Sequence, residues 1–505
     1  MTIELPSSAP ARVSVTKRHL DARHCAELDC IAILLPAQGI PALPAALPDP
    51  QRWLERKHAP VSDTTTATTV LDNRRATRVV ALRRSTVDSG IAAADAARRL
   101  ASACLATGPE SVGILVPDTD PEAASRLAQF LLEAFLINDF RLPNFATAGT
   151  SKSTVRRIRL LAPVSGTDRL LSVNRAAANN LARWLGAMPP NYLDASAMRS
   201  AATRLARELG LSVRFYSLAQ LKKMGAGAFC AVAQGNADND AGILRLSYTP
   251  KSARSAKLLS LLGKGILFDT GGNNLKPFRA MLDMHIDMQG SAVALAATRA
   301  LVQLGYPHRI DCWLALTENR IGPTAYKSQD ILTSLSGKTI QTIHTDAEGR
   351  LALADTLTLA SRRKPDLIMD FATLTGACVN AVTTRYSGVF SNRPALYPLL
   401  KQIGRDVAER LWPFPIDDEF PRDIRSDVAD LVQCRVDGNG DHIYAAAFLN
   451  EFVPDDIPWV HIDLSAAQHK GGLGLVASEL TGFGARLTID VAQALPQILA
   501  TVADD

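Results

Sequence analysis

The sequence lacks the cysteine patterns of a disulfide framework and of a thiolate zinc site. Its seven cysteines are odd in number and include no CxxC pair, which argues against both arrangements and fits a reducing compartment. No apolar run approaches the roughly 18 residues that a membrane span needs. The first residues also lack the charged and apolar regions of a secretory signal. We therefore expect a cytoplasmic protein without a membrane partner.

An excess of charge of one sign is also missing. The formal net charge of +5 is small for 505 residues, so overall electrostatics does not indicate nucleic acid as a partner. The segment RRATRVVALRR, residues 74–84, has five arginines and no acid. Because basic runs are most often solvated faces, we interpret it as the solvated face of a strand.

Three common catalytic motifs are absent. The chain contains no HExxH, no GxxxxGK followed by Ser or Thr, and no GxSxG. These absences argue against a helical zinc protease, a phosphate-binding loop and a nucleophile elbow. No repeat with a period of 20 to 50 residues is present, so a solenoid is not expected.

Apolar runs of strand length alternate with helical patterns in the second part of the chain. The runs are LLSLLGKGILFD, IDCWLALTEN, DLIMDFATLTG and WVHIDLS, and helical patterns such as SAVALAATRALVQLG separate them. Continuous apolar strands alternating with helices predict an α/β fold with a mostly parallel, mixed central sheet covered by helices. A Pro, Gly and Ser stretch at residues 160–169 suggests a linker. We predict a smaller α/β domain over residues 1–165 and a catalytic domain over 166–505.

Acidic residues stand where the predicted strands end. They are Asp269, Glu318, Asp370 and Asp463. Function in parallel sheets gathers outside the carboxyl ends of the strands. A single acid at such a place is more often a helix cap or a solvated loop residue, so the neighbouring residues decide the interpretation.

Two segments add lysines, glycines and further acids. In GKGILFDTGGNNLKP, Lys264, Asp269 and Lys276 surround Gly271 and Gly272, which would let the backbone turn tightly beside an ion or substrate. In MLDMHIDMQG, two aspartates stand one helical turn apart. They could share one face at the start of a helix.

The segment HTDAEGR concentrates charge in a few residues. An extended backbone would point Asp346, Glu348 and Arg350 to the same side. If these two acids met Asp269 and Asp287 in one pocket, their mutual repulsion would raise some of the pKa values. A hard divalent cation such as Mg or Mn, or Zn through oxygen ligands, would relieve that repulsion. Shared carboxylates suit two ions that hold a bridging water.

Several of these segments closely resemble signature segments of the cytosol (leucine) aminopeptidase family. They are GKGILFDTGGNNLKP, HTDAEGRLALAD and DFATLTGACVNA, with weaker resemblance in PPNYLDASAM, ENRIGPTAY and TGFGARL. The resemblance covers roughly residues 170–490. It implies a metal-dependent hydrolase, an aminopeptidase acting on peptides with a free N-terminus, with leucine-like residues preferred. It also implies a smaller N-terminal α/β domain, two divalent ions per subunit and a homohexamer.

The resemblance assigns the metal ligands residue by residue. They are Lys264, Asp269, Asp287, Asp346 and Glu348. By the same resemblance, Asp269 and Glu348 bridge two ions, Mn or Zn, with Mg and Co as alternatives. A lysine ligand must be neutral, and deprotonating it at pH 7 costs about 4.6 kcal/mol. A neighbouring dication would supply that energy. The alternative is that Lys264 is a cation paired with the acids.

The resemblance also implies catalytic and substrate-binding residues. The bridging hydroxide would attack the first peptide carbonyl, Lys276 would stabilise the developing oxyanion, and Arg350 would hold a bicarbonate that shuttles the proton. The residues matching the substrate pocket are Met284, Thr373, Leu374 and Gly376. Without the resemblance, a methionine such as Met284 would more often be plain core.

Some positions depart from the family pattern without removing a ligand. His344 replaces the usual asparagine before TDAEGR, Asn274 stands where serine is common, and YKSQDIL replaces a conventional RPGD segment. A lone histidine such as His344 more often packs or supports a ligand than binds metal. Ser465 and Gln468 make the region near the pocket more polar than a strict leucine preference would suggest.

Two other classes of function remain open on the sequence. The same scaffold could serve as a DNA-binding or regulatory protein, which would need a continuous basic groove. It could also be a structural hexamer with weak or no peptidase activity. A metallophosphatase also uses paired carboxylates and two ions, but it would not explain a lysine ligand.

Overall fold

The computed structural model describes most of the chain. The described residues are 3–6, 11–16, 21–39, 43–47, 50–54, 62, 65–85, 90–118, 120–147, 154–238, 240–252 and 255–503. Within these ranges every helix is too short or too polar to cross a membrane.

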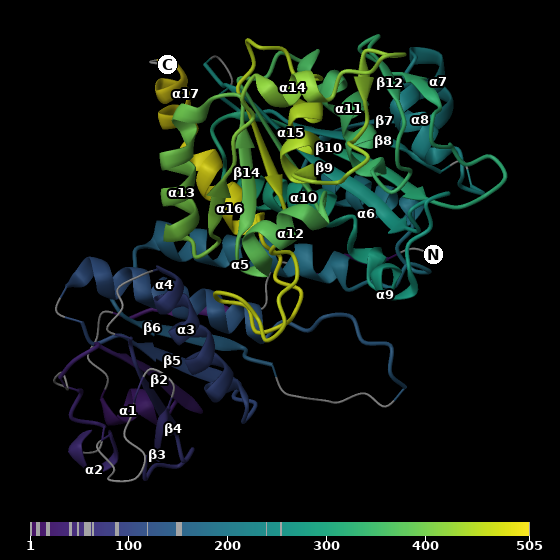
Figure 1. The fold of residues 1–505 in the computed structure, drawn as a ribbon. Helices are drawn as coiled ribbons and strands as arrows, with labels where there is room; N and C mark the ends of the chain where they lie inside the picture. Colours follow the sequence, from purple (N-terminus) through teal and green to yellow (C-terminus); the bar gives the residue numbers. More distant parts are fainter. Residues whose placement is uncertain are drawn as a thin grey trace.

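The first part of the chain forms one sheet, at the lower left in Figure 1, with the strand order β1-β6-β5-β2-β4-β3. Neighbouring strands are parallel except for β3 and β4. The strands are β1 (Arg12–Val15), β2 (Cys30–Leu35), β3 (Ala67–Val70), β4 (Arg78–Arg83), β5 (Ser111–Leu115) and β6 (Arg157–Leu161). Helices α3 (Gly90–Leu105) and α4 (Pro121–Asn138) share an apolar cluster with the sheet. We call β1–β6 with α1 (Ala22–Cys25), α2 (Pro50–Leu54), α3 and α4 the N-terminal unit.

The second part forms a larger sheet with the order β15-β14-β17-β13-β9-β10-β8-β7. Strands β17, β13, β9 and β10 run parallel in its middle, and β14, β8 and β7 add antiparallel pairs. The strands are β7 (Ser212–Ser217), β8 (Gly242–Tyr248), β9 (Leu258–Asp269), β10 (Arg309–Asn319), β13 (Leu367–Ala372), β14 (Ser387–Ser391), β15 (Leu411–Pro413) and β17 (Trp459–Asp463). The predicted α/β fold with a mixed, largely parallel central sheet is confirmed.

Helices cover both faces of this larger sheet. One face packs on α5 (Gly166–Gly186), α6 (Ala195–Glu208), α10 (Gln289–Gln303) and α16 (Ala485–Gln493), and the other on α8 (Gly227–Ala233), α11 (Glu348–Ser361) and α15 (Asp441–Asn450). Successive residues of β13 point to opposite faces: Met369 and Phe371 join the first cluster, Ile368 and Ala372 the second. Burial on both faces explains why these strands are apolar without interruption.

Helix α5 follows the predicted division of the chain at residue 165. Ser165 caps the helix by accepting a hydrogen bond from the Asp168 amide at 3.0 Å. The helix packs against α4 on one side and α10 on the other (Figure 1). The division into domains at this residue stays a prediction.

A buried ionic network joins the N-terminal unit to the rest of the chain. Glu133 of α4 is fully buried and lies 2.8 Å from Arg486 Nε and 3.5 Å from Arg175 Nη1. Arg175 of α5 also pairs with Asp490 of α16. Glu409 accepts hydrogen bonds from backbone amides at the start of α16, and burial raises its pKa to about 7. Three helices are therefore tied together by charges that have little access to water.

We predict that Arg486→Met destabilises the protein by about 3–5 kcal/mol, because it leaves the buried Glu133 carboxylate without its main partner. The midpoint of the first denaturant-induced transition measures the effect. Arg99→Met is the control, since Arg99 pairs with Asp95 in an exposed part of α3 and its loss should cost less than about 1 kcal/mol. Equal, small shifts in both variants would contradict a stabilising role for the network.

Candidate metal centre

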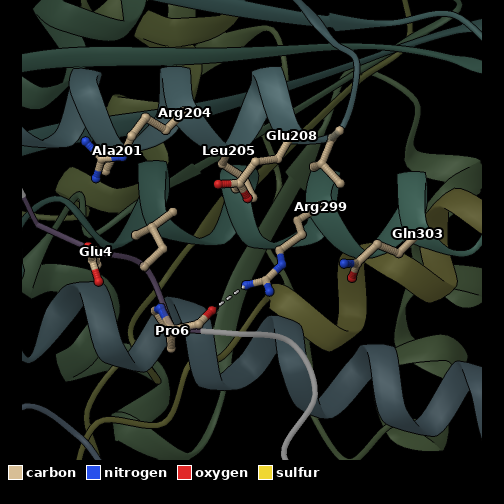
Figure 2. A pocket seen from close by; sticks show the side chains of 10 residues that line it. Glu4, Pro6, Ala201, Arg204, Leu205, Glu208, Arg299 and Gln303 are labelled. Carbon is tan, nitrogen blue, oxygen red and sulfur yellow. Dashed lines mark hydrogen bonds between the residues drawn. The ribbon is translucent and has the colours of Figure 1, made fainter.

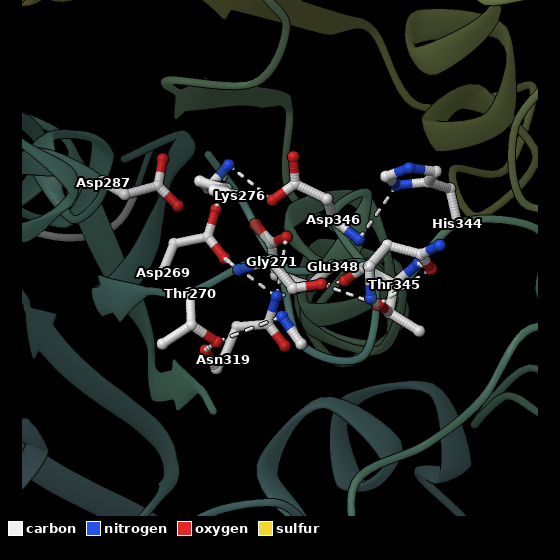
Figure 3. A network of polar contacts seen from close by, with 12 residues as sticks. Asp269, Thr270, Gly271, Lys276, Asp287, Asn319, His344, Thr345, Asp346 and Glu348 are labelled. Atoms are coloured by element: carbon white, nitrogen blue, oxygen red, sulfur yellow. Dashed lines mark hydrogen bonds and ion pairs between the residues drawn. The ribbon is translucent and has the colours of Figure 1, made fainter. Parts of the chain in front are cut away.

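The candidate site lies where β9 and β10 end and α11 begins. Figure 3 shows its acids together with Lys276 and Asn319. Asp269 is the last residue of β9, Asn319 is the last residue of β10, and Glu348 is the first residue of α11. Ligand oxygens of Asp269, Asp346 and Glu348 lie within 4.8 Å of one another. The carboxyl edge of the sheet thus collects acids that are far apart in the sequence, as the strand-end pattern predicts.

Two lysines lie among these acids. Lys264, in β9, is 3% exposed, and its Nζ lies 2.8 Å from Asp287 Oδ2 and 3.0 Å from Glu348 Oε1. Lys276 Nζ lies 2.8 Å from Asp269 Oδ2 and 2.5 Å from Asp346 Oδ1. Each ammonium group therefore stands between two carboxylates contributed by different segments.

Close approach of the backbone makes room for this arrangement. A Cβ at Gly349 would stand 2.7 Å from Lys264 Nζ, and one at Gly271 would stand 2.9 Å from Asp346 Oδ1. Gly271 and Gly272 have φ of +86° and +65°, which side chains rarely tolerate. The predicted tight turn at this glycine pair is confirmed.

Burial and crowding shift the pKa values of the charged groups. Burial, with the charge of Glu348, raises the pKa of Asp269 to about 7. Burial, with the charges of Asp269 and Glu348, raises the pKa of Asp287 to about 8. Burial opposes the charge of Lys264, but the surrounding acids raise its pKa above the ordinary value. The four carboxyl groups outnumber the two lysines that pair with them.

The donor set fits a hard cation. Asp287 Oδ2 and Asp346 Oδ1 are buried and accept no well-aligned hydrogen bond from the described residues, although an ammonium group lies near each. Carboxylate oxygens with free lone pairs are ligands that Mg and Mn prefer. Zn also accepts carboxylate oxygens and takes nitrogen ligands as well. Lys264, Asp269, Asp287, Asp346 and Glu348 could therefore hold divalent ions once Lys264 loses its proton.

Asn319 contacts the acids and was missed by sequence reasoning. Its Nδ2 donates to Asp269 Oδ1 at 2.8 Å, to the Thr345 carbonyl at 3.0 Å and to Glu348 Oε2 at 3.2 Å. Glu318, the acid that the sequence analysis noted at this strand end, pairs with Arg320 and is not among the residues that line the cavity. The register shifts between Thr317 and Asn319, and such an irregularity re-aims side chains in a way that strand alternation does not predict.

The other two strand-end acids differ in role. Asp370 is fully buried and accepts a hydrogen bond of 2.6 Å from Trp459 Nε1. Its Oδ1 lies 2.6 Å from His461 Nδ1, and Asp370 is not among the residues that line the cavity. Asp463 lines the cavity and accepts from the Leu374 amide and the Thr375 hydroxyl. Asp463 therefore fixes the loop after β13, whereas Asp370 belongs to the core.

Two local expectations are wrong. Residues 344–350 are not extended: the chain turns at Thr345 and Asp346, and α11 begins at Glu348. Asp283 and Asp287 do not share one face, because they flank the one-turn helix η1 (Met284–Ile286), where Asp283 is exposed and Asp287 is 4% exposed. A turn and a short 3₁₀ segment replace the regular periods that the sequence argument assumed.

Arg350 is buried in the first turn of α11. Its Nη2 lies 2.7 Å from Asp441 Oδ2, and its Nη1 donates to the Gln433 carbonyl at 3.1 Å. Asp441, which sequence reasoning did not select, is therefore the carboxylate partner of Arg350.

Asn274 follows the glycine turn, and its side chain accepts a hydrogen bond from the Thr345 amide at 2.8 Å. This contact holds the glycine turn against the segment that carries Asp346 and Glu348.

His344 lies outside the cluster of acids. It is exposed, and its Nδ1 accepts from the Asp346 amide at 3.3 Å. This contact agrees with a supporting group rather than a ligand.

A cavity of about 990 Å³ opens over the acids and lysines. Every residue that the sequence assigned to metal binding, catalysis or substrate binding lines it. The further lining residues include Ala467, Asp463, Ser465 and Gln468. Met284, Thr373, Leu374 and Gly376 thus share one cavity with the charged cluster, and their individual roles stay predictions.

Comparison with known proteins adds a family match. The sequence model described as "Cytosol aminopeptidase family, catalytic domain" matches residues 180–489. A protein of Syntrophotalea carbinolica named "Probable cytosol aminopeptidase" is 38% identical over 378 residues, covering 73% of this chain and 75% of the relative. One of the same name from Synechococcus sp. (strain CC9311) is 37% identical over 388 residues, covering 75% of this chain and 77% of the relative.

Solved structures agree with this match. The bottromycin maturation enzyme BotP superposes with a TM-score of 0.80 at 28% identity, covering 93% of this chain and 99% of its own. Its complex with Mn gives a TM-score of 0.79 at 28% identity, with 92% and 99% covered.

We predict that Asn319→Ala weakens divalent-ion binding by about 10- to 100-fold, because its amide orients two of the carboxylates. Titration calorimetry with Mn on chelator-stripped protein measures the affinity. Asn174→Ala is the matched control, since the Asn174 side chain donates to the Leu170 carbonyl within α5. Unchanged affinity in Asn319→Ala would show that the acids hold their positions without this amide.

Proposed function

The chain belongs to the cytosol aminopeptidase family, and from this premise we propose that it is a two-metal enzyme that removes leucine-like residues from the free N-termini of peptides. The observation that carries the proposal is the grouping of Lys264, Asp269, Asp287, Asp346 and Glu348 in one cavity. The family match supports reading this buried lysine among four acids as part of a metal site. Membership makes the chain an aminopeptidase of the hydrolase class; the preference and the mechanism are proposed.

We propose that these five residues hold two divalent ions, Mn or Zn, with Mg and Co as alternatives. The Mn complex of BotP supports manganese for this chain. Binding would require loss of the Lys264 proton, and the charge of the ions favours that loss. When bound, the ions would supply a water of lowered pKa as the bridging nucleophile.

Lys276 is the proposed stabiliser of the oxyanion that develops on the peptide carbonyl. Burial opposes its charge, but Asp269, Glu348 and Asp346 raise its pKa above the ordinary value. A protonated Lys276 could donate to an oxygen that gains negative charge.

Arg350 is the proposed anion-holding group. Its guanidinium faces the cavity, stays charged at neutral pH, and is oriented by Asp441 and the Gln433 carbonyl. A bicarbonate held there would exchange a proton with the reacting groups, a task that the arginine itself cannot perform.

The loop after β13 is the proposed seat of the substrate amine and first side chain. Its Leu374 carbonyl would accept from the amine, while Asp463 holds the Leu374 amide at 3.2 Å. Met284, Thr373 and Gly376 would surround the first side chain. Ser465 and Gln468 line the same cavity, so we propose a range wider than leucine alone.

The alternative, a DNA-binding, regulatory or structural hexamer with weak or no peptidase activity, is not favoured. Residues 78–83 of the arginine-rich run form β4, and residues 79–82 are buried. The interpretation as a solvated strand face is therefore wrong for the strand itself, whereas Arg74 and Arg75, before the strand, are exposed. Arg75 pairs with Asp29 and Arg84 with Asp118. A homohexamer in the cytoplasm remains our proposal on the strength of the family.

The direct test is release of the first residue from unblocked and N-acetylated dipeptides by chelator-stripped protein reloaded with Mn, Zn or Mg. We expect metal-restored activity on the unblocked peptides alone, highest with leucine-like first residues. Activity on the acetylated peptides would exclude an exopeptidase that recognises a free amine. Silence of folded, metal-loaded protein would favour the binding or structural alternative.

We predict that Lys276→Ala lowers kcat about 10²- to 10³-fold, the usual effect of removing one oxyanion donor, while the metal content stays at the wild-type value. Metal content is measured by atomic emission after gel filtration. Lys327→Ala serves as the control, because its side chain is 69% exposed. Loss of metal from Lys276→Ala would place this lysine among the ligands instead.

A further inference from the structure

A loop at residues 469–481 connects the cavity wall to the N-terminal unit. It is the yellow loop that descends beneath α12 (Gly376–Val382) toward α3 in Figure 1. The residues just before it, Ser465, Ala467 and Gln468, line the cavity. Thr481 returns the chain to its starting point, donating from its amide to Ala467 and from its hydroxyl to the Ala466 carbonyl. The two ends of the loop therefore share one position at the cavity wall.

The tip of this loop is part of the apolar core of the N-terminal unit. Leu475 is 1% exposed and Val476 is 4% exposed, and both belong to the apolar cluster formed by the N-terminal sheet with α3 and α4. Apart from Leu475 and Val476, most members of this cluster come from the N-terminal unit. The tip is therefore held by a different core from the one that supports the root.

Polar contacts fix the tip further. Asn138, at the end of α4, donates to the Leu475 carbonyl at 2.9 Å and accepts from the Ala477 amide at 2.8 Å. Arg98 of α3 donates to the Val476 carbonyl at 3.3 Å. A Cβ at Gly472 would lie 2.3 Å from that same carbonyl oxygen. The N-terminal unit thus determines the backbone path of the loop.

The root of the loop contacts a second part of the cavity wall. The Nδ1 of His469 lies 2.8 Å from the Thr384 hydroxyl, and Thr384 lines the cavity. Gln468 and Leu480 form an isolated antiparallel bridge that closes the root. The root of the loop therefore contacts Thr384 in addition to following the lining residues Ser465, Ala467 and Gln468.

We propose that the N-terminal unit shapes the substrate pocket through this loop, with Leu475 and Asn138 as positioning residues for the wall formed by Ser465, Ala467 and Gln468. The proposal rests on the proposed aminopeptidase function and assigns a task to the N-terminal unit. An unanchored loop of this length would sample many backbone conformations. Anchoring it in a second core holds the wall in one position before a substrate arrives, which lowers the cost of ordering on binding.

The test compares Leu475→Ala with Leu82→Ala, a matched deletion in β4 within the same apolar cluster. Manganese-loaded variants are assayed on leucyl, alanyl and glutaminyl anilides. In Leu475→Ala the ratio of kcat/KM between leucyl and alanyl substrates should change about threefold to tenfold, mainly through KM. Leu82→Ala should keep the wild-type ratio, and Leu475→Met should restore it.

Asn138→Ala provides a second variant that leaves the apolar cluster intact, in case Leu475→Ala does not fold. Hydrogen exchange of residues 463–469 is measured in every variant and does not depend on activity. Faster exchange there in Asn138→Ala or Leu475→Ala, and not in Leu82→Ala, supports the proposal. Wild-type hydrogen exchange and wild-type substrate ratios in both Leu475→Ala and Asn138→Ala would overturn the proposal.

Failure of the proposed function would look different. A wild-type protein that hydrolyses no unblocked substrate would end the aminopeptidase proposal. The exchange measurements would then still decide whether the N-terminal unit holds the cavity wall in place.

Discussion

Charge compensation at the end of β9 is the constraint on which the rest of the site depends. Four carboxylates and two ammonium groups share a space with little access to water, where an unpaired charge is costly. Lys264 joins the end of η1 to the start of α11, and Lys276 joins the glycine turn to Asp346. Each ammonium therefore fixes the relative position of two segments, and the site and the local fold stabilise each other.

This arrangement requires that the first turns of α10 and α11 lie close to the sheet. A Cβ at Gly290 would lie 2.0 Å from the Phe371 carbonyl oxygen, and Gly349 lies against Lys264. Small residues at these positions let α10 and α11 bring their first residues to the strand ends. Burial and the neighbouring acids raise the pKa values of Asp269 and Asp287, although the lysines lower them. Binding of cations would complete the compensation.

The sequence predicted the central strands β9, β10, β13 and β17 because their apolar runs are continuous, but it did not predict β7, β8, β14 and β15, which complete the larger sheet. It also predicted that the segments GKGILFDTGGNNLKP and HTDAEGR place charged side chains at one site, because Asp269 directly follows an apolar run and both segments resemble signatures of the family. It could not predict Asn319 or Asp441, whose contacts depend on a register shift and on the packing of a distant helix. The extended form of residues 344–350 was wrong because alternation was assumed where a helix begins.

The ionic network around Glu133 also limits which N-terminal segments can be combined with the rest of this chain. Arg486 is buried and Arg175 is half-buried, and their shared carboxylate partner comes from the N-terminal unit. If another protein's segment replaced the N-terminal unit, Arg486 and Arg175 would lose Glu133 as a partner. The replacement would need an acidic residue at the position of Glu133 to compensate their charge. We therefore expect the N-terminal unit and the rest of the chain to be inherited together, because exchange of either one alone would require matched changes in the residues of this network.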